Sequence, residues 1–116
     1  MSIPEPTPKN AGKIVPESLI HFINSSKLDI EAKHYGVTLI EERDQFGRRK
    51  YGQPLRTEDG RDDIEDARQE LGDLLQYCWK ARMNDCDLSP IRRLVPILEF
   101  ILNAEEPIDK QLVGQN

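Results

Sequence analysis

The stretch from Arg61 to Tyr77 restricts the fold more than any other part of the chain, because two kinds of side chain repeat along it with a helical period. One row is apolar and holds Ile64, Ala67, Leu71, Leu74 and, just beyond the stretch, Cys78. The neighbouring row is mainly acidic and holds Asp66, Glu70, Asp73 and Tyr77. Side chains at such spacings share one face of an α-helix. The pattern therefore predicts a helix that buries its apolar row and turns its acidic row toward a cleft.

The sequence also indicates where the two preceding helices begin and end. Pro16 suits the first turn of a short helix that ends at a pair of serines. Residues 27–46 follow as a long helix, which Gly36 could interrupt and which Gly47 is expected to cap. The apolar residues of this helix are Leu28, Ala32, Tyr35, Leu39 and Phe46. The next segment is rich in glycine and arginine and is expected to be an ordered loop.

The acidic helix is expected to begin with Asp62 or Asp63 as its N-cap and to end near Met83. Ser89, which precedes a proline, is a candidate N-cap for a last helix, and Pro96 marks either a kink or the true first turn of that helix. The residues expected to face inward are Ile91, Leu94, Val95, Leu98, Ile101 and Leu102. These segments together predict an all-α fold.

One domain is expected over residues 17–104. The chain has 116 residues, which is the length of a single domain, and its hydrophobic content of 37% permits only a modest core. Residues 1–16 hold four of the eight prolines and are expected to form a flexible arm, and residues 105–116 are expected to form a polar tail. A modest core favours oligomerisation.

Composition excludes several classes of protein. The net charge of −5 has the wrong sign for a domain that binds polymeric nucleic acid through its phosphates. The two cysteines lack the spacing of a zinc site or a redox motif, which favours a reducing, cytoplasmic setting. Residues 1–16 lack the features of a secretory signal, and no apolar run approaches the roughly 20 residues that a membrane span needs. We therefore expect a cytoplasmic protein without a membrane partner.

A carboxylate interrupts the apolar seam of the 27–46 helix, because Glu42 occupies the gap between Leu39 and Phe46. An unpaired carboxylate in such a place costs on the order of several kcal/mol. Antiparallel packing against the acidic helix would bring Glu42 close to Glu70 and Asp73. A cluster of carboxylate oxygens suits Mg²⁺ or Mn²⁺, which share their coordination with substrate phosphates. The pattern therefore points to metal-assisted hydrolysis of a phosphoanhydride.

Candidate site residues follow from this chemistry. A spare carboxylate would accept the proton of the attacking water, and basic and aromatic side chains near the loop would bind a polyphosphate and a base. The candidate catalytic residues are Glu42 and Glu70. The candidate metal ligands are Glu41, Glu42, Glu70 and Asp73. The candidate substrate-binding residues are Lys50, Tyr51, Arg61, Asp66 and Tyr77.

Three segments, ERDQFGRRKYGQPL, DGRD and DARQELGDLLQY, resemble phage and bacterial members of the MazG-like group of nucleoside triphosphate pyrophosphohydrolases. That group carries an ExxE motif on one helix and an ExxD motif on the next. The second motif is present as Glu70-Leu71-Gly72-Asp73. In place of the first motif, Glu41 is followed by Asp44 and Glu42 by Gln45, so the metal ligands of this helix stay open.

The resemblance covers about residues 28–83 and implies both a fold and an activity. The fold would be a MazG-like helical bundle whose four-helix core is completed in a homodimer or homotetramer. The activity would be Mg²⁺-dependent hydrolysis of a nucleoside or deoxynucleoside triphosphate to the monophosphate and pyrophosphate, in control of nucleotide pools. Two alternatives stay open, a non-catalytic helical interaction module with an acidic face and a module that binds nucleotides without cleaving them.

Overall fold

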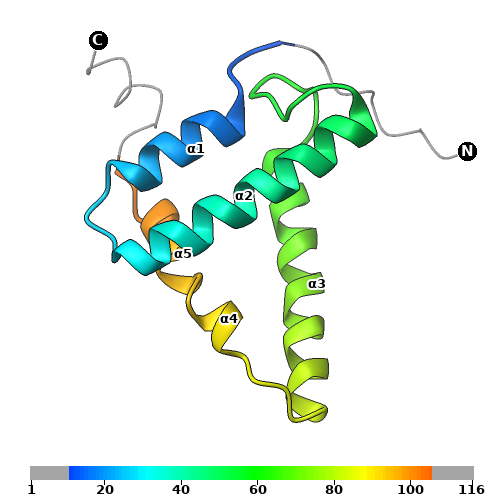
Figure 1. The fold of residues 1–116 in the computed structure, drawn as a ribbon. Coiled ribbons are helices and arrows are strands. Elements are labelled where there is room, and N and C mark those ends of the chain that lie inside the picture. The colour runs from blue at the N-terminus through cyan, green and yellow to red at the C-terminus, as the bar shows by residue number, and fades with distance from the viewer. Residues whose placement is uncertain (1–10, 106–116) are drawn as a thin grey trace, which may run out of the picture.

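The computed structural model describes residues 11–105, and every regular element in this range is a helix (Figure 1). The helices are α1 (Val15–Asn24), α2 (Ile30–Tyr51), α3 (Asp63–Met83), α4 (Ser89–Arg92) and α5 (Val95–Leu102). The prediction of an all-α fold is therefore confirmed for this range. None of these helices combines the length and the apolar character that crossing a membrane requires.

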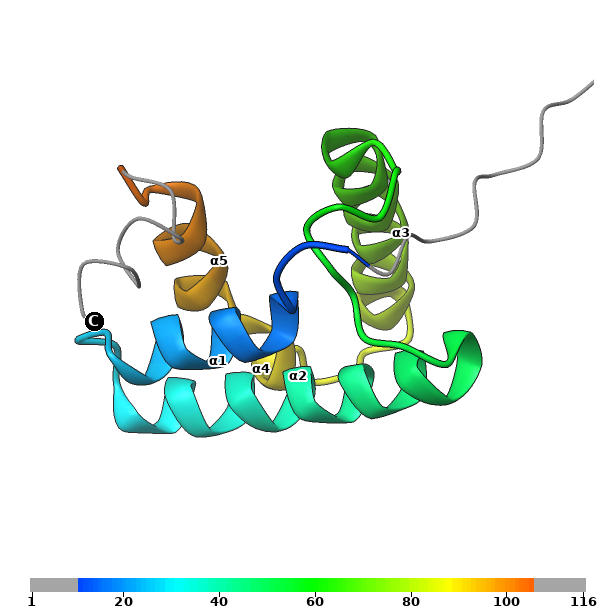
Figure 2. The same cartoon turned by 90° about the horizontal axis from the view of Figure 1, so that it is seen from above.

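Three of the helices share a small core. α1 lies along α2, and α5 packs against the N-terminal half of α2 (Figures 1 and 2). Ile23 of α1 is fully buried, and Ile97 of α5 is nearly so. The rings of Phe22 and Phe100 add a contact with their centroids 4.8 Å apart. This core holds the first and last helices on one side of α2.

Gly36 lies where α2 packs against Ile97 of α5. The helix does not break there, and Gly36 is buried, because a side chain at this position would collide with Ile97. The glycine therefore permits close packing of two helices.

The end of α2 differs from the prediction. The helix continues through Gly47 to Tyr51, and Gly52 is the residue that caps it, with the left-handed φ of 75° and its N–H donating to the carbonyl of Arg48 at 2.8 Å. A glycine within a helix costs only about 1 kcal/mol, and the hydrogen bonds from Arg48 to Asp44 at 2.9 and 3.0 Å support this turn. The assignment of residues 48–51 to a loop was therefore wrong.

The segment that precedes α1 pairs with the loop that follows α2. Val15 N–H donates to the carbonyl of Leu55, and Thr57 N–H donates to the carbonyl of Lys13, each at 2.9 Å. α1 begins at Val15, inside the range 1–16 that was predicted as an arm, and residues 1–10 lie outside the described range, as do residues 106–116 of the predicted tail. These backbone bonds give the loop at 52–62 a fixed position beside α1.

Helix α3 has the predicted bounds but not the predicted burial. Asp62 is its N-cap, accepting a hydrogen bond from Glu65 N–H at 3.0 Å, and Met83 is its last residue. No residue of α3 is buried, and Ile64, Leu71 and Leu74 are 79%, 47% and 39% exposed. Both views show α3 standing apart from α1 and α5 (Figures 1 and 2). Packing among residues 11–105 thus does not bury the apolar row of α3.

The C-terminal helical segment is divided. α4 ends at Arg92, and Pro96 lies in the first turn of α5, which is one of the two predicted outcomes. Ser89 is the first residue of α4 and not its N-cap, and its hydroxyl donates to Asp87 at 2.6 Å. Four of the side chains predicted to face inward are exposed, namely Ile91, Val95, Leu98 and Leu102, at 39%, 44%, 44% and 72%. The buried residue of α4 and α5 is Ile97.

Candidate functional site

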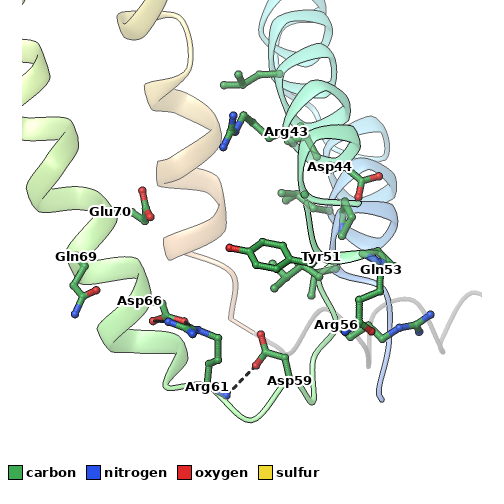
Figure 3. A pocket seen from close by; sticks show the side chains of 18 residues that line it. Arg43, Asp44, Tyr51, Gln53, Arg56, Asp59, Arg61, Asp66, Gln69 and Glu70 are labelled. Carbon is green, nitrogen blue, oxygen red and sulfur yellow. Dashed lines mark hydrogen bonds and ion pairs between the residues drawn. The ribbon is translucent and has the colours of Figure 1, made fainter. Parts of the chain in front are cut away.

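A cavity of about 990 Å³ lies between α2 and the first turns of α3, with α1 and the loop at 52–62 as its other walls (Figure 3). This volume falls within the range of about 300–1,000 Å³ that small-molecule sites occupy. One wall is apolar and includes Val15, Pro16, Leu19, Leu39 and Leu55. The charged lining residues are Arg43, Arg56, Arg61, Asp44, Asp59, Asp66 and Glu70. An apolar wall beside charged groups of both signs suits a ligand that has both an apolar part and a charged part.

Helix α2 contributes one face to the cavity. Leu39, Arg43, Gly47 and Tyr51 are spaced by four residues and therefore share a side of the helix. The guanidinium carbon of Arg43 lies 4.4 Å from the centroid of the Phe46 ring, and Lys50 Nζ lies 5.2 Å from the centroid of the Tyr51 ring. Cation–π contacts of this kind orient both basic side chains along the helix surface.

Arg61 and Asp66 form a two-bonded ion pair at the entry to α3. Arg61 Nε donates to Asp66 Oδ2 at 2.8 Å, and Nη2 donates to Oδ1 at 3.1 Å. The hydrogen bonds from Arg61, more than its charge, hold the pKa of Asp66 below the usual value of 3.8. Asp66 is therefore an ionised carboxylate that positions Arg61 at the cavity wall.

Asp44 is neutralised in a similar way. Arg48 donates to both of its oxygens and also approaches Glu17 Oε1 to 3.8 Å. In contrast, Glu70 lines the cavity and has no hydrogen bond or ion pair with another residue of the range 11–105. Glu70 is thus the lining carboxylate that can accept a cationic ligand without giving up an internal partner.

Asp59 lies at the floor of the cavity. Its side chain is only 5% exposed, and its Oδ1 accepts a hydrogen bond from the backbone N–H of Arg61 at 3.1 Å. Gly60 between them has a φ of 81°, which a glycine adopts without strain. This turn directs the Asp59 carboxylate into the interior (Figure 3).

The sequence-predicted site residues divide into two groups. Four of them line the cavity: Tyr51, Arg61, Asp66 and Glu70. The other five lie outside it, on exposed faces of α2 and α3: Glu41, Glu42, Lys50, Asp73 and Tyr77. In the part of the chain that the structure describes, no three His, Cys, Asp or Glu side chains gather closely enough to hold a metal. The described residues therefore do not bring the predicted metal-binding carboxylates together.

Glu42 misses the cavity because of the side of α2 on which it lies. Of the predicted seam, Ala32 is buried and Leu39 lines the cavity, whereas Tyr35 and Phe46 are 42% and 44% exposed. Glu42 is exposed as well, so this part of the seam lies at the surface. The face that meets the cavity is rotated toward Arg43 and Gly47. Helical period alone identifies a stripe, but it does not tell which of two adjacent stripes meets a partner helix.

Several lining residues were not singled out from the sequence, namely Arg43, Asp44, Arg56 and Asp59. The i, i+4 spacing of Arg43, Gly47 and Tyr51 was a signal for the first, once the helix is known to continue past Gly47. Asp59 precedes a glycine, which signals a turn, but its burial depends on contacts with α1 and α2 that a local pattern does not carry.

Comparison of the chain with models of known protein families, with curated protein sequences and with solved structures finds no match in any of the three.

Proposed function

We propose that this protein is a metal-dependent nucleotide pyrophosphohydrolase that converts a nucleoside or deoxynucleoside triphosphate to the monophosphate and pyrophosphate in the cytoplasm. The observation that carries the proposal is one cavity lined by Arg43, Arg61, Glu70 and Tyr51. Guanidinium groups bind phosphate through paired N–H donors, and an aromatic ring offers a surface on which a base stacks. The ExxD motif of the resemblance adds independent support, because its Glu70 is the member that lines the cavity.

Each lining residue has a role in this proposal. Arg43 and Arg61 neutralise the negative charge of the polyphosphate, and Asp66 keeps Arg61 oriented through its two hydrogen bonds. The apolar wall excludes water from the base and sugar. Glu70 is the candidate proton acceptor for the attacking water, since it has no internal partner among the described residues.

A divalent cation suits carboxylate ligands, although a single chain places few carboxylates near one another. Mg²⁺ in phosphate-processing sites is held by one or two carboxylates together with substrate phosphates, and Glu70 provides one such carboxylate. When bound, Mg²⁺ or Mn²⁺ would neutralise phosphate charge and make a coordinated water more acidic. Glu41, Glu42 and Asp73 remain candidate ligands, and Glu42 remains a candidate catalytic residue, only if further packing brings them toward Glu70.

A second copy of the chain would supply that packing. Apolar side chains of α3 are exposed beside its acidic row. On α2, Tyr35 and Phe46 are exposed on the face that also holds Glu42. Soluble monomers seldom leave contiguous apolar faces of this kind in water. We therefore infer a homodimer or homotetramer in which these faces complete a MazG-like helical bundle. Lys50 and Tyr77, which lie outside the cavity, would then be able to approach substrate only through the assembly.

The direct test is release of pyrophosphate from a panel of ribonucleoside and deoxynucleoside triphosphates with and without Mg²⁺. The wild-type protein should release pyrophosphate only with the metal, and Glu70→Gln should lower kcat by at least about a hundredfold, which is the low end of what a general base contributes. Glu99→Gln on α5 is a matched control, because Glu99 is exposed and lies outside the cavity.

Two outcomes would contradict the proposal. Undiminished turnover in Glu70→Gln would remove Glu70 from the site. Absence of turnover with every nucleotide, together with no thermal stabilisation by Mg²⁺ and nucleotide, would favour the non-catalytic interaction module, which the exposed apolar face of α3 also fits.

A further inference from the structure

We infer that Asp59 reads the base of the bound nucleotide and selects guanine. This inference rests on the proposed function for the presence of a nucleotide in the cavity, and it adds a base preference and the residue that sets it. Among residues 11–105, Asp59 is the charged side chain that is buried, and it is one of the residues that line the cavity.

The hydrogen bonding of Asp59 is incomplete. A carboxylate offers about four lone-pair sites, and a buried one is costly unless donors occupy several of them. Asp59 Oδ1 accepts from Arg61 N–H, whereas no other described residue donates to Oδ2. The remaining acceptor capacity of this carboxylate is therefore available to a ligand.

The position of Asp59 suits a base better than a phosphate. Figure 3 shows its carboxylate turned into the cavity beneath the Tyr51 ring, at the end away from Arg43. A phosphate would be repelled by this carboxylate. It is better matched to the side of the cavity that holds Arg43, Glu70 and the guanidinium of Arg61, which is turned toward Asp66 (Figure 3). A base at the Asp59 end would have the Tyr51 ring available for stacking.

The acceptor oxygens of Asp59 discriminate among the bases. Guanine presents two adjacent donors, its N1–H and its 2-amino group, which match the two oxygens of a carboxylate. Adenine and cytosine place a ring nitrogen that is an acceptor beside their amino group. Uracil and thymine place a carbonyl oxygen on each side of their single N–H. Guanine is thus the base that presents one donor to each oxygen of the Asp59 carboxylate, while its O6 acceptor lies outside this pair of donors.

Arg56 also lines the cavity, but its guanidinium turns away from Asp59 (Figure 3) and donates a hydrogen bond from Nη1 to the carbonyl of Gly12 at 3.1 Å. The choice of base therefore rests on Asp59.

The wild-type protein provides the first test. Binding of guanosine and inosine monophosphates is measured by calorimetry, because inosine differs from guanosine only in lacking the 2-amino group. Hydrogen bonds to a charged acceptor predict guanosine binding about ten- to a hundredfold tighter. Equal affinity for the two nucleotides would overturn the inference, and this comparison needs no variant.

The second test is Asp59→Asn, which keeps an oxygen to accept from Arg61 N–H and replaces the other oxygen with an NH₂ donor. Xanthine carries an oxygen at the position of the guanine 2-amino group, so the variant should prefer xanthosine monophosphate to guanosine monophosphate. The ratio of the two affinities should change at least about tenfold relative to wild type. Glu58→Gln, at an exposed neighbour, should leave the ratio unchanged. An unchanged ratio in folded Asp59→Asn would also overturn the inference.

Turnover separates this inference from the proposed function. Pyrophosphate release from GTP, ATP, CTP, UTP and XTP is measured beside the binding experiments. Guanosine preference with no hydrolysis of any nucleotide would refute the pyrophosphohydrolase and support base reading by Asp59. Hydrolysis of GTP, ATP, CTP and UTP with equal kcat/KM would support the pyrophosphohydrolase and refute guanine selection.

Discussion

At the scale of single residues, the Arg61–Asp66 pair links the loop at 52–62 to the first turn of α3. Because Arg61 lowers the pKa of Asp66, this pair favours the folded state fully above the unfolded pKa of Asp66, near 3.8, and the contribution is lost as the pH falls through the lower folded pKa. The Asp66 side chain is 37% exposed, so solvent screens the interaction and the effect on stability is small. The pair therefore matters more for orienting Arg61 than for stability.

A titration tests this pairing. In Arg61→Gln the pKa of the Asp66 carboxyl should rise toward its usual value, because the two guanidinium hydrogen bonds are lost. The carboxyl carbon chemical shift of Asp66, followed by NMR as the pH is lowered, measures the change. Arg68→Gln is the control, since Arg68 pairs with Glu65 at 3.6 Å and not with Asp66. Identical Asp66 titrations in both variants would show that the ion pair does not form in solution.

At the scale of elements, the end of α2 decides where Tyr51 lies. Gly47 is inside the helix with open space around its Cα, so Gly47→Ala should stabilise the protein by about 0.5–1 kcal/mol. Gly52 has the left-handed φ of 75°, so Gly52→Ala should destabilise it by about 1–2 kcal/mol. Urea denaturation measures both changes. Destabilisation by Gly47→Ala would mean that the helix ends at Gly47 after all.

The elements also show what local sequence can and cannot predict. The start of α3 was predicted well because an N-cap depends on groups within one turn, here Asp62 and the N–H of Glu65. The end of α2 was misjudged because two glycines could each act as the cap, and only the conformation of the chain distinguishes them. Helical spacing selected Glu70, and its basic side chain near the loop selected Arg61; both line the cavity. Burial of Asp59 depends on segments more than 40 positions apart, such as Lys13 and Thr57, whose backbone bond fixes the loop.

At the scale of the whole molecule, the apolar row of α3 is the feature that a single chain does not explain. Leu71 and Leu74 are exposed although they lie on a helix whose bounds and capping agree with the sequence. Each fully buried leucine would contribute about 1.5–3 kcal/mol, so a second copy that covers this row gains stability that the isolated chain lacks. The wild-type protein should therefore sediment as a dimer or tetramer, and its melting temperature should rise with concentration.

Leu71→Asp tests this assembly without disturbing the core that α1, α2 and α5 share, because α3 has no buried residue. The variant should sediment as a monomer, with a lower melting temperature that no longer depends on concentration. Ile30→Asp is the matched control, since Ile30 is 79% exposed at the first turn of α2, away from the apolar row of α3. Equilibrium sedimentation of all three proteins distinguishes the outcomes. A monomeric wild type at every concentration would contradict the oligomer, and with it the proposed packing that brings Glu42 and Asp73 to Glu70 at a shared cation.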